Sequence, residues 1–396
     1  MKYRLLLIKR LLEDILMFPL ILFGRTIALF KPLDKEYKVF YFFPFYHTGG
    51  AEKVHALIVK ATADKDCIIF FTRKSHNQAF LQKFEAPGCT IKDISGYTDN
   101  KLIYFVNIIF RGVIASYINR QKNTPVVFNG QCNFGYKLSP WIKENVRQIE
   151  LIHSISNFSY IRVPFLPFID QTVMISRQKI DEHLLLYKRL GIPKSFETRI
   201  DYIPNASEFE QFNAGDKDFS SIKVLYSGRA TAEKRSYLVA EIAKRVYDLD
   251  PSIKFFMAGD DFIALDKTRL NFINYKGNIA NEQELAALYK EANVVIITSS
   301  TEGFPLAVIE GMAYGCAILA TPVGDIPVHI NENENGFLFN TVDDEHQIIE
   351  QAVNIILALK KDSALLEKIS GANIRYAQAN FSFERFAADY HKIIFV

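Results

Sequence analysis

Two glutamates, Glu302 and Glu310, stand where apolar packing alone would not place a charge. They are the only charged residues in the stretch 294–320, VVIITSSTEGFPLAVIEGMAYGCAILA. A carboxylate among Leu, Val, Ile and Met side chains costs several kcal/mol to bury unless hydrogen-bond donors reach it. The two hydroxyls of a diol, such as a ribose, would supply such donors. The alternative is that Glu310 lies on a solvated helix stripe or pairs with a distant Lys or Arg.

The elements around these glutamates predict a βαβ unit. The β-branched run at 294–300 is typical of a strand covered on both faces, and a turn follows at 301–304. Pro305 suits a first helical position, and Gly315 suits the left-handed residue just past the helix end. The helix then aims its free N–H groups and positive dipole end at the turn. We therefore expect a site for an anionic phosphate, with Glu310 holding a sugar beside it.

The segment from Glu302 to Glu310 resembles the E-x7-E motif of the GT-B family of retaining, nucleotide-sugar-dependent glycosyltransferases, the group 1 or family 4 type. The resemblance implies that Glu310 holds the ribose of the nucleotide. It also implies that Glu302 touches the donor sugar together with the loop after it, Gly303, Phe304, Pro305 and Leu306.

Two cations, Arg229 and Lys234, flank a turn between a strand-like run, IKVLYSG, and a helical pattern. Such a pair makes a clamp for a diphosphate whose charge grows as the sugar leaves. The stretch from Gly228 to Lys234 resembles the family pattern G-R-x-x-x-E-K, although Ala232 stands where proline is commoner. Solvated surface charge is the alternative for either cation alone.

The first half of the chain carries two further candidates. Gly49 and Gly50 follow the strand-like run YKVFYFF at a strand-to-helix turn, where a backbone can approach a ligand closely. They resemble the family's G-G-x-E loop, whose amides approach the donor phosphates or the acceptor; an ordinary tight turn is the alternative. His153 closes a strand-like run, and the family has a His at a similar strand end near the donor sugar. A lone His is also often structural.

Strand-like runs alternate with helical patterns through most of the chain, which predicts doubly wound α/β domains. The resemblance implies the GT-B fold, with two Rossmann-like domains facing across a cleft and a terminal helix that returns to the first. We predict these segments: an interfacial segment at 1–34, an acceptor domain at 35–205, a linker at 206–220, a donor-nucleotide domain at 221–380 and the returning helix at 381–396.

Composition excludes several other classes. The 396 residues carry a net charge of only +3, which does not suggest nucleic acid as a partner. The four cysteines are far apart, and we expect them to be reduced core residues of a cytosolic protein. No Cys or His spacing indicates a zinc site, and three D-x-D triplets, at 64–66, 216–218 and 248–250, sit where solvated charge is the simpler interpretation. We therefore expect no cofactor and no required metal.

The N-terminal segment, residues 1–34, mixes Lys and Arg with long apolar runs. Its longest uncharged run, 15–24, is far short of the roughly 20 residues that a spanning helix needs. Two interpretations remain: a segment lying at the anionic cytoplasmic face of a membrane, or a helix packed on the first domain.

Together these features predict a retaining glycosyltransferase that moves a sugar from a nucleotide-sugar donor to a glycan or lipid-linked acceptor, in the synthesis of a cell-surface polysaccharide. One alternative is a nucleotide-sugar epimerase of related architecture. Another is a catalytically degenerate, glycan-binding partner subunit, which the presence of Glu302, Glu310, Arg229 and Lys234 disfavours.

Overall fold

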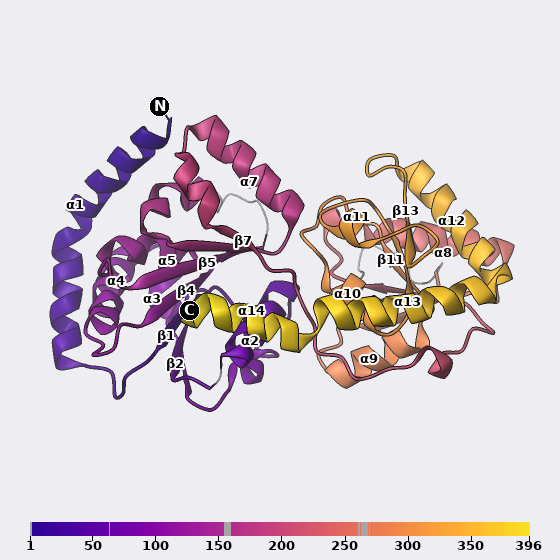
Figure 1. Ribbon diagram of the computed structural model, residues 1–396, viewed down its shortest axis with the longest axis horizontal. Helices are drawn as coiled ribbons and strands as arrows, with labels where there is room; N and C mark the ends of the chain where they lie inside the picture. Colours follow the sequence, from indigo (N-terminus) through magenta and orange to yellow (C-terminus); the bar gives the residue numbers. More distant parts are fainter. Residues whose placement is uncertain (1, 63, 154–159, 260–261, 263–267, 269) are drawn as a thin grey trace. The chain divides into compact units, whose positions relative to one another are not determined.

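The computed structural model describes residues 2–62, 64–153, 160–259, 262, 268 and 270–396. The chain forms two α/β units, drawn in Figure 1. Unit 1 comprises Met1–Ile203 and Phe386–Val396, and unit 2 comprises Pro204–Arg385. Each unit is built on its own parallel sheet, as the alternation of strand-like and helical runs predicts.

The described residues of unit 1 form a seven-stranded sheet of order β3-β2-β1-β4-β5-β6-β7, in which each recorded strand pair is parallel. The order reverses between β1 and β4, which is the point where doubly wound sheets bind ligands outside the carboxyl ends of their strands. The strands are β1 Val39–Phe43, β2 Cys67–Phe71, β3 Cys89–Asp93, β4 Val126–Gly130, β5 Arg147–Ile152, β6 Gln171–Met174 and β7 Ile200–Tyr202.

Helices cover this sheet on both sides, and α4 and α5 pack on one face through the apolar side chains of β1, β2 and β4. Among the described residues, the α-helices of unit 1 include α1 Lys2–Phe30, α2 Gly50–Ala61, α3 Ser95–Thr98, α4 Tyr104–Asn119, α5 Asn133–Leu138, α7 Arg177–Leu190 and most of α14 Phe383–Phe395. Short 3-10 turns are η1 Leu81–Phe84, η2 Ser139–Trp141, η3 Val163–Phe168 and η4 Lys194–Arg199.

The long helix α1 lies against α4, on the outer side of unit 1 (Figure 1). The two backbones approach closely through glycines, because a Cβ on Gly24 would lie 2.0 Å from the carbonyl oxygen of Ile109 and one on Gly112 would lie 2.1 Å from that of Ile21. The inner side of α1 is thus packed on the first domain, while its outer side keeps large apolar residues exposed. Within the described residues, no helix is both long and apolar enough to cross a membrane.

The sheet of unit 2 has six strands among its described residues, in the order β10-β9-β8-β11-β12-β13, and the order reverses between β8 and β11. Its recorded pairs are again parallel. The strands are β8 Lys223–Ser227, β9 Lys254–Ala258, β10 Ile273–Gly277, β11 Val294–Ile297, β12 Ala317–Ala320 and β13 Gly336–Leu338.

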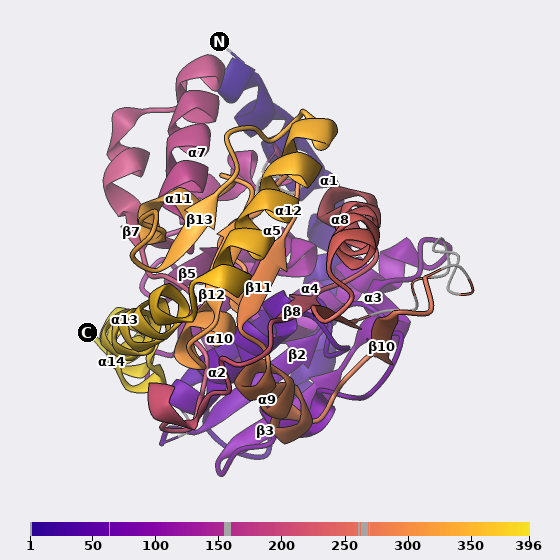
Figure 2. The ribbon, with the colours of Figure 1, turned by 90° about the vertical axis from the view of Figure 1, so that its right-hand side faces the viewer.

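Successive residues of these strands point to opposite faces of the sheet, and both faces are covered (Figure 2). Val294 and Ile296 pack toward α8 Ser236–Leu249 and α12 Glu345–Lys361, whereas Val295 and Ile297 pack toward α9 Glu282–Glu291 and α10 Leu306–Ala313. The long helix α13 Ser363–Phe381 contributes to both cores. The remaining short elements are η5 Ala214–Asp216, η6 Ala232–Lys234 and α11 Ile326–His329.

The stretch at 206–220, which the sequence predicts to be a linker, packs into unit 2. Phe212 is buried in its core, and the ammonium of Lys217 is buried against backbone carbonyls at the end of α9, among them those of Tyr289 and Ala292. A Lys at this position satisfies carbonyls that the last helical turn leaves without a partner. Lys217, in this polar stretch, therefore caps the neighbouring helix α9.

The prediction that all four cysteines are reduced is wrong for Cys67 and Cys89. They begin the paired parallel strands β2 and β3, where their Cα atoms lie 4.6 Å apart, and they form a disulfide. The sequence does not show this pairing, because Cys67 and Cys89 are 22 residues apart and meet only through the register of β2 and β3. Cys132 and Cys316 are free and buried, as expected.

Candidate functional site

The turn after β8 and the turn after β11 meet at the carboxyl edge of unit 2's sheet, because these two strands are neighbours. Lys234, in the first turn, donates to the Glu302 carboxylate of the second turn, with Nζ and Oε1 2.5 Å apart. The hydroxyl of Ser299 donates to the same oxygen at 2.6 Å. Two of the predicted residues, Lys234 and Glu302, thus form a largely buried ion pair.

The buried guanidinium of Arg235 holds these two turns together. It donates to the carbonyls of Thr298 at 2.7 Å, Ser299 at 3.1 Å and Val342 at 2.6 Å. In return, the hydroxyl of Thr298 donates to the carbonyls of Lys234 and Arg235. Arg235 has a left-handed backbone, with φ of 49°, which is uncommon for a residue with a Cβ and is tolerated where surrounding contacts fix it.

Glycines let four loops close over this edge. A Cβ on Gly259, after β9, would lie 1.8 Å from the carbonyl oxygen of Gly228, and one on Gly324, after β12, would lie 2.1 Å from that of Gly303. Both Gly259 and Gly324 have positive φ. The predicted residues Gly228 and Gly303 are therefore fixed from behind by glycines that the sequence does not single out.

The loop that leads into α10 ends one residue later than predicted. Pro305 is the N-cap residue, with φ of −74° and ψ of 136°, and Leu306 is the first helical residue. The buried ring of Phe304 precedes it, and the Phe304 carbonyl accepts from the side-chain amide of Asn205 at 2.8 Å. Since proline has no side-chain acceptor, it leaves the first N–H groups of α10 uncapped by its side chain. This end of α10 is suited to an anion.

Glu310 is 8% exposed and lies among hydroxyl groups. Its Oε1 accepts from the hydroxyl of Ser207 at 3.3 Å. Burial raises the pKa of the Tyr289 phenol, and the nearby Glu310 charge raises it further, which places this phenol beside the carboxylate. The interpretation of Glu310 as a solvated surface residue is therefore wrong, and its helix presents it inside unit 2.

Arg229 lies in the same turn as Lys234 but is exposed. Its backbone carbonyl accepts from the hydroxyl of Tyr226 at 2.9 Å, which fixes the main chain and leaves the guanidinium toward solvent. The structure therefore brings Lys234 to Glu302 and keeps Arg229 at the rim of the same turn.

The unit 1 candidates occupy the switch point of the other sheet. Gly49 is the N-cap of α2 and Gly50 its first residue. The carboxylate of Glu52 lies over Gly49, since a Cβ there would be 2.2 Å from Glu52 Oε2. Glu52 is also 3.7 Å from Nε2 of His47. Gly49 has extended backbone, so a larger residue at this position would be free of backbone strain and would only displace the end of the Glu52 side chain.

His153 follows β5, and its Nε2 lies 3.0 Å from Nε2 of His55 on α2. Its backbone N–H donates to the Gln131 side chain at 3.1 Å, where Gln131 follows β4 with φ of 55°. Burial lowers the pKa of His153 to about 4, and burial together with His153 holds the pKa of His55 well below its ordinary value. Both imidazoles are therefore neutral at pH 7.

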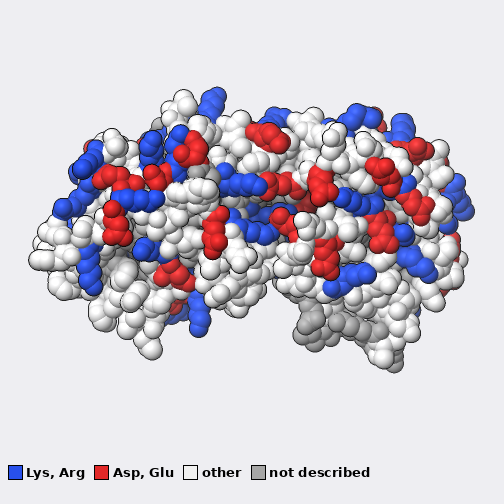
Figure 3. Space-filling view, turned by 90° about the horizontal axis from the view of Figure 1, so that it is seen from below, with Lys and Arg blue, Asp and Glu red and all other residues white. Residues whose placement is uncertain are grey.

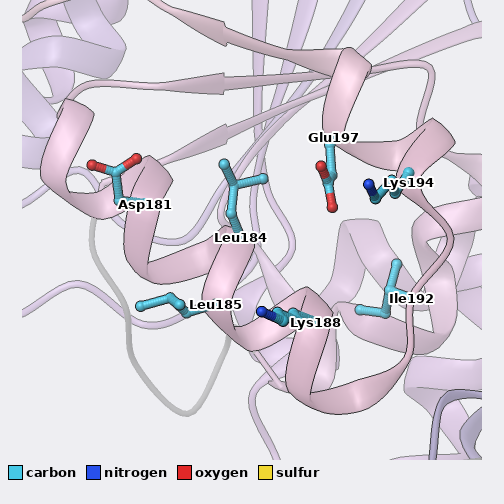
Figure 4. A pocket seen from close by; sticks show the side chains of 7 residues that line it. All are labelled: Asp181, Leu184, Leu185, Lys188, Ile192, Lys194 and Glu197. Carbon is cyan, nitrogen blue, oxygen red and sulfur yellow. The ribbon is translucent and has the colours of Figure 1, made fainter.

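An open hollow of about 630 Å³ lies elsewhere on unit 1, between α7 and η4 (Figure 4). Its lining contains none of the predicted site residues and comprises Asp181, Leu184, Leu185, Lys188, Ile192, Lys194 and Glu197. In the described part of the chain, no cluster of three or more His, Cys, Asp or Glu side chains could hold a metal.

Several site residues could not be selected from the sequence. Ser299 is one of two adjacent serines in a strand-like run, Arg235 follows the recognised Lys234, and Ser207 lies in the predicted linker. His55 sits within an amphipathic helix pattern. Only for Arg235 and His55 does the sequence offer a signal, because each lies close to a recognised motif.

The arrangement of both units is typical of doubly wound α/β proteins. Each unit has a doubly wound parallel sheet whose strand order reverses where the motif-bearing turns, glycine loops and polar side chains gather. Doubly wound sheets of this kind bind ligands at the point where the strand order reverses. Anabaena Alr3699/HepE, crystallised in complex with UDP and glucose, shares the fold with a TM-score of 0.69 at 15% identity, over 90% of this chain and 99% of that one. The predicted GT-B fold is confirmed.

Residues 207–372 match the profile of the family Glycosyl transferases group 1. The matched residues lie within unit 2 and make up less than half of the chain, and they support the predicted resemblance to group 1 glycosyltransferases. D-inositol 3-phosphate glycosyltransferase of Mycobacterium sp. (strain KMS) is 24% identical over 191 residues, 43% of this chain and 42% of the relative. A phosphatidylinositol N-acetylglucosaminyltransferase subunit from Arabidopsis thaliana is 25% identical over 199 residues, 48% of this chain. The chain aligns with 42% of the length of each of these relatives.

We predict that Arg235→Met lowers the free energy of unfolding by at least about 2 kcal/mol, because three buried carbonyls lose a charged donor. Urea unfolding of the full chain measures it. Arg229→Met is the matched control, since this arginine is exposed, and should change stability by less than about 0.5 kcal/mol. Equal stabilities for the two variants would refute the role given to Arg235.

Proposed function

We propose that this chain transfers a sugar from a nucleotide-sugar donor with retention of anomeric configuration, and that unit 2 binds the donor nucleotide. The observation that carries this proposal is the pairing of Lys234 with Glu302 at the carboxyl edge of β8 and β11, beside the start of α10. The structural neighbour crystallised with UDP and glucose supports a donor of this kind.

In this proposal the diphosphate lies against Lys234, Arg229 and the first N–H groups of α10. As the bond between sugar and diphosphate breaks, negative charge grows on the leaving oxygen, and preorganised cations and dipoles lower the energy of that state. Lys234 is held by Glu302, whose carboxylate is itself fixed by the hydroxyl of Ser299, so the ammonium needs no reorganisation during the reaction. These groups supply the positive charge without a required metal.

Glu302 is engaged by an ammonium and a hydroxyl, so it is suited to orienting groups rather than to nucleophilic attack. We infer front-face attack by the acceptor, with the leaving diphosphate taking the acceptor proton. The new glycosidic bond then forms on the face from which the diphosphate departs. His153, at the end of β5, is assigned to a hydroxyl of the donor sugar.

We predict that Lys234→Ala and Arg229→Ala each lower kcat/KM about ten- to a thousandfold, because each removes a positive charge that would face the leaving group. A panel of radiolabelled nucleotide sugars, followed by product analysis, measures transfer and the slow hydrolysis of the donor. Lys368→Ala, an exposed lysine on α13, is the control and should behave as the unchanged chain.

The same panel separates the other functions. A changed epimer of the free nucleotide sugar indicates an epimerase, and binding with neither transfer nor hydrolysis indicates a glycan-binding subunit. Because Arg229 is exposed, Arg229→Ala should fold normally. A folded Arg229→Ala or Lys234→Ala variant with unchanged kcat/KM would contradict the diphosphate clamp.

Glu310 is assigned to the ribose. We predict that Glu310→Gln, which keeps the shape and removes the charge, weakens binding of the free nucleoside diphosphate by about 1.5 to 3 kcal/mol. Isothermal titration calorimetry measures the change, and Glu367→Gln, exposed on α13, is the matched control. An unchanged dissociation constant would return Glu310 to a structural role beside Ser207 and Tyr289.

We further propose that α1 rests on an anionic membrane surface and that the acceptor is lipid-linked, as in the synthesis of a cell-surface glycan. The exposed side of α1 carries a stripe of large apolar residues at helical spacing: Leu5, Ile8, Leu12, Ile15, Leu22 and Leu29. Exposed Lys2, Arg4, Lys9 and Lys31 accompany it. Such a helix lies in the headgroup region, with its bases among the phosphates.

Neighbouring features support this surface. Leu102, 92% exposed, and Phe105 lie before and at the start of α4, the helix on which α1 packs. Figure 3 shows Lys, Arg, Asp and Glu side chains interspersed with uncharged surface at its left-hand end, which belongs to unit 1. The Arabidopsis relative, whose name includes phosphatidylinositol, supports a lipid acceptor.

We predict that replacing Leu5, Leu12 and Leu16 together by Gln lowers the affinity for anionic vesicles at least tenfold, because three apolar side chains no longer enter the acyl boundary. Vesicle flotation at low salt measures binding, and Leu185→Gln, on the exposed face of α7, is the control. Substitutions are used because deleting residues 1–30 would also remove Gly24 and Ile21, which pack on α4, and could destabilise unit 1. Failure of the unchanged chain to bind would end the membrane proposal.

A further inference from the structure

The imidazoles of His55 and His153, both in unit 1, share one hydrogen bond. Nε2 of His55 and Nε2 of His153 are 3.0 Å apart, and both rings are neutral at pH 7. One of these nitrogens must then carry a proton and the other must accept it. Each neutral ring holds one proton, so the ring that accepts through Nε2 carries its own proton on Nδ1. The contact therefore couples the tautomers of the two histidines.

The surroundings of His55 decide which ring donates. Within the described residues, Nδ1 of His55 is buried and has no hydrogen-bond partner. If His55 accepted through Nε2, its proton would sit on this Nδ1 as a buried donor with nothing to bind. Buried donors without a partner are rarer in proteins than buried acceptors without one. The arrangement with the smaller penalty has the His55 proton on Nε2.

The ring of His55 cannot easily turn away from this role. Its face stacks on Phe43 of β1, with centroids 4.3 Å apart and an angle of 16° between the planes. Its edge fills the space beside Gly130, the last residue of β4, where a Cβ would lie 2.7 Å from Nε2. His55 is 1% exposed. The strands on both sides of the switch point thus hold the imidazole in place.

We propose that His55 is a positioning residue, which donates its Nε2 proton to Nε2 of His153 and thereby fixes His153 in the tautomer protonated on Nδ1. The inference rests on the proposed role of His153 at the donor sugar. In this tautomer His153 presents an N–H to its surroundings, so it donates a hydrogen bond to a sugar oxygen instead of accepting one. The neutral pair also adds no positive charge beside the donor sugar as its bond to the diphosphate breaks.

The tautomer can be observed directly in the full chain labelled with ¹⁵N-histidine, through two-bond ¹H–¹⁵N correlation spectra. His153→Asn identifies the resonances of His153 by their loss. In the unchanged chain we expect Nδ1 of His153 to show the shift of a protonated nitrogen. His55→Gln retains an amide donor near the position of Nε2 and should preserve this pattern, whereas His55→Leu should move His153 toward protonation on Nε2.

Kinetics supply the second readout. His55→Leu should lower kcat/KM for the donor about tenfold, the effect of one lost hydrogen bond, and His55→Gln should restore most of it. In the His153→Asn background, His55→Leu should cause no further loss, because the effect passes through His153. A full additional loss in that background would indicate a merely structural residue and would overturn the proposal.

A His153 ring protonated on Nε2 in the unchanged chain would overturn it equally. Should His55→Leu fail to fold, which thermal unfolding reports, the spectra of the unchanged chain and of His55→Gln still decide. A chain without transfer activity would contradict the proposed function, while the spectra would continue to test the histidine pair independently.

Discussion

The carboxyl edge of a parallel sheet leaves loops whose carbonyl groups have no strand partner, and in unit 2 the guanidinium of Arg235 satisfies three of them. It reaches the carbonyls of Thr298 and Ser299, which follow β11, from a residue that follows β8. The turn carrying Lys234 and the turn carrying Glu302 are thereby set at a fixed separation. Without this constraint, neither would have a defined place for an anion.

The same constraint explains where sequence patterns overestimate regular structure. The β-branched run at 294–300 predicts a strand through Ser300, but β11 ends at Ile297. Thr298 and Ser299 have side chains suited to a strand, yet their carbonyls accept from Arg235 and leave the ladder. Similarly, proline's fixed φ suits a first helical position, but Pro305 has extended ψ because it must turn the chain into α10.

Much of the fold could be predicted because strong local patterns agreed with the topology. The buried strands β1, β2 and β11 are continuous apolar runs, and parallel sheets require both faces to be covered. Strands such as β7 and β10 lack this pattern, since Ile200–Tyr202 and Ile273–Gly277 are partly exposed and mix apolar with polar residues. Pairing with β6 and β9, rather than local preference, makes them strands.

The site residues also differ in how far the sequence predicts them. Glu302, Glu310 and Lys234 could be chosen because charged residues in apolar or turn contexts need an explanation. His55, Ser207 and the disulfide between Cys67 and Cys89 could not, because each depends on a partner far away in sequence.

The environments of the two glutamates give them different tasks. Glu302 neutralises Lys234, so the turn after β8 can hold an ammonium in a largely buried place without uncompensated charge. Under the proposed function, a diphosphate arriving at this ammonium would enter a site whose charge is already balanced, and the α10 dipole and the exposed Arg229 would add the attraction. Glu310 instead accepts from the hydroxyl of Ser207 and lies near the buried phenol of Tyr289. Under the proposed function, a ribose bound at Glu310 would replace the Ser207 hydroxyl by its own hydroxyl donors. Recognition at Glu310 would then depend on the geometry of the sugar, whereas recognition at Lys234 would depend on charge.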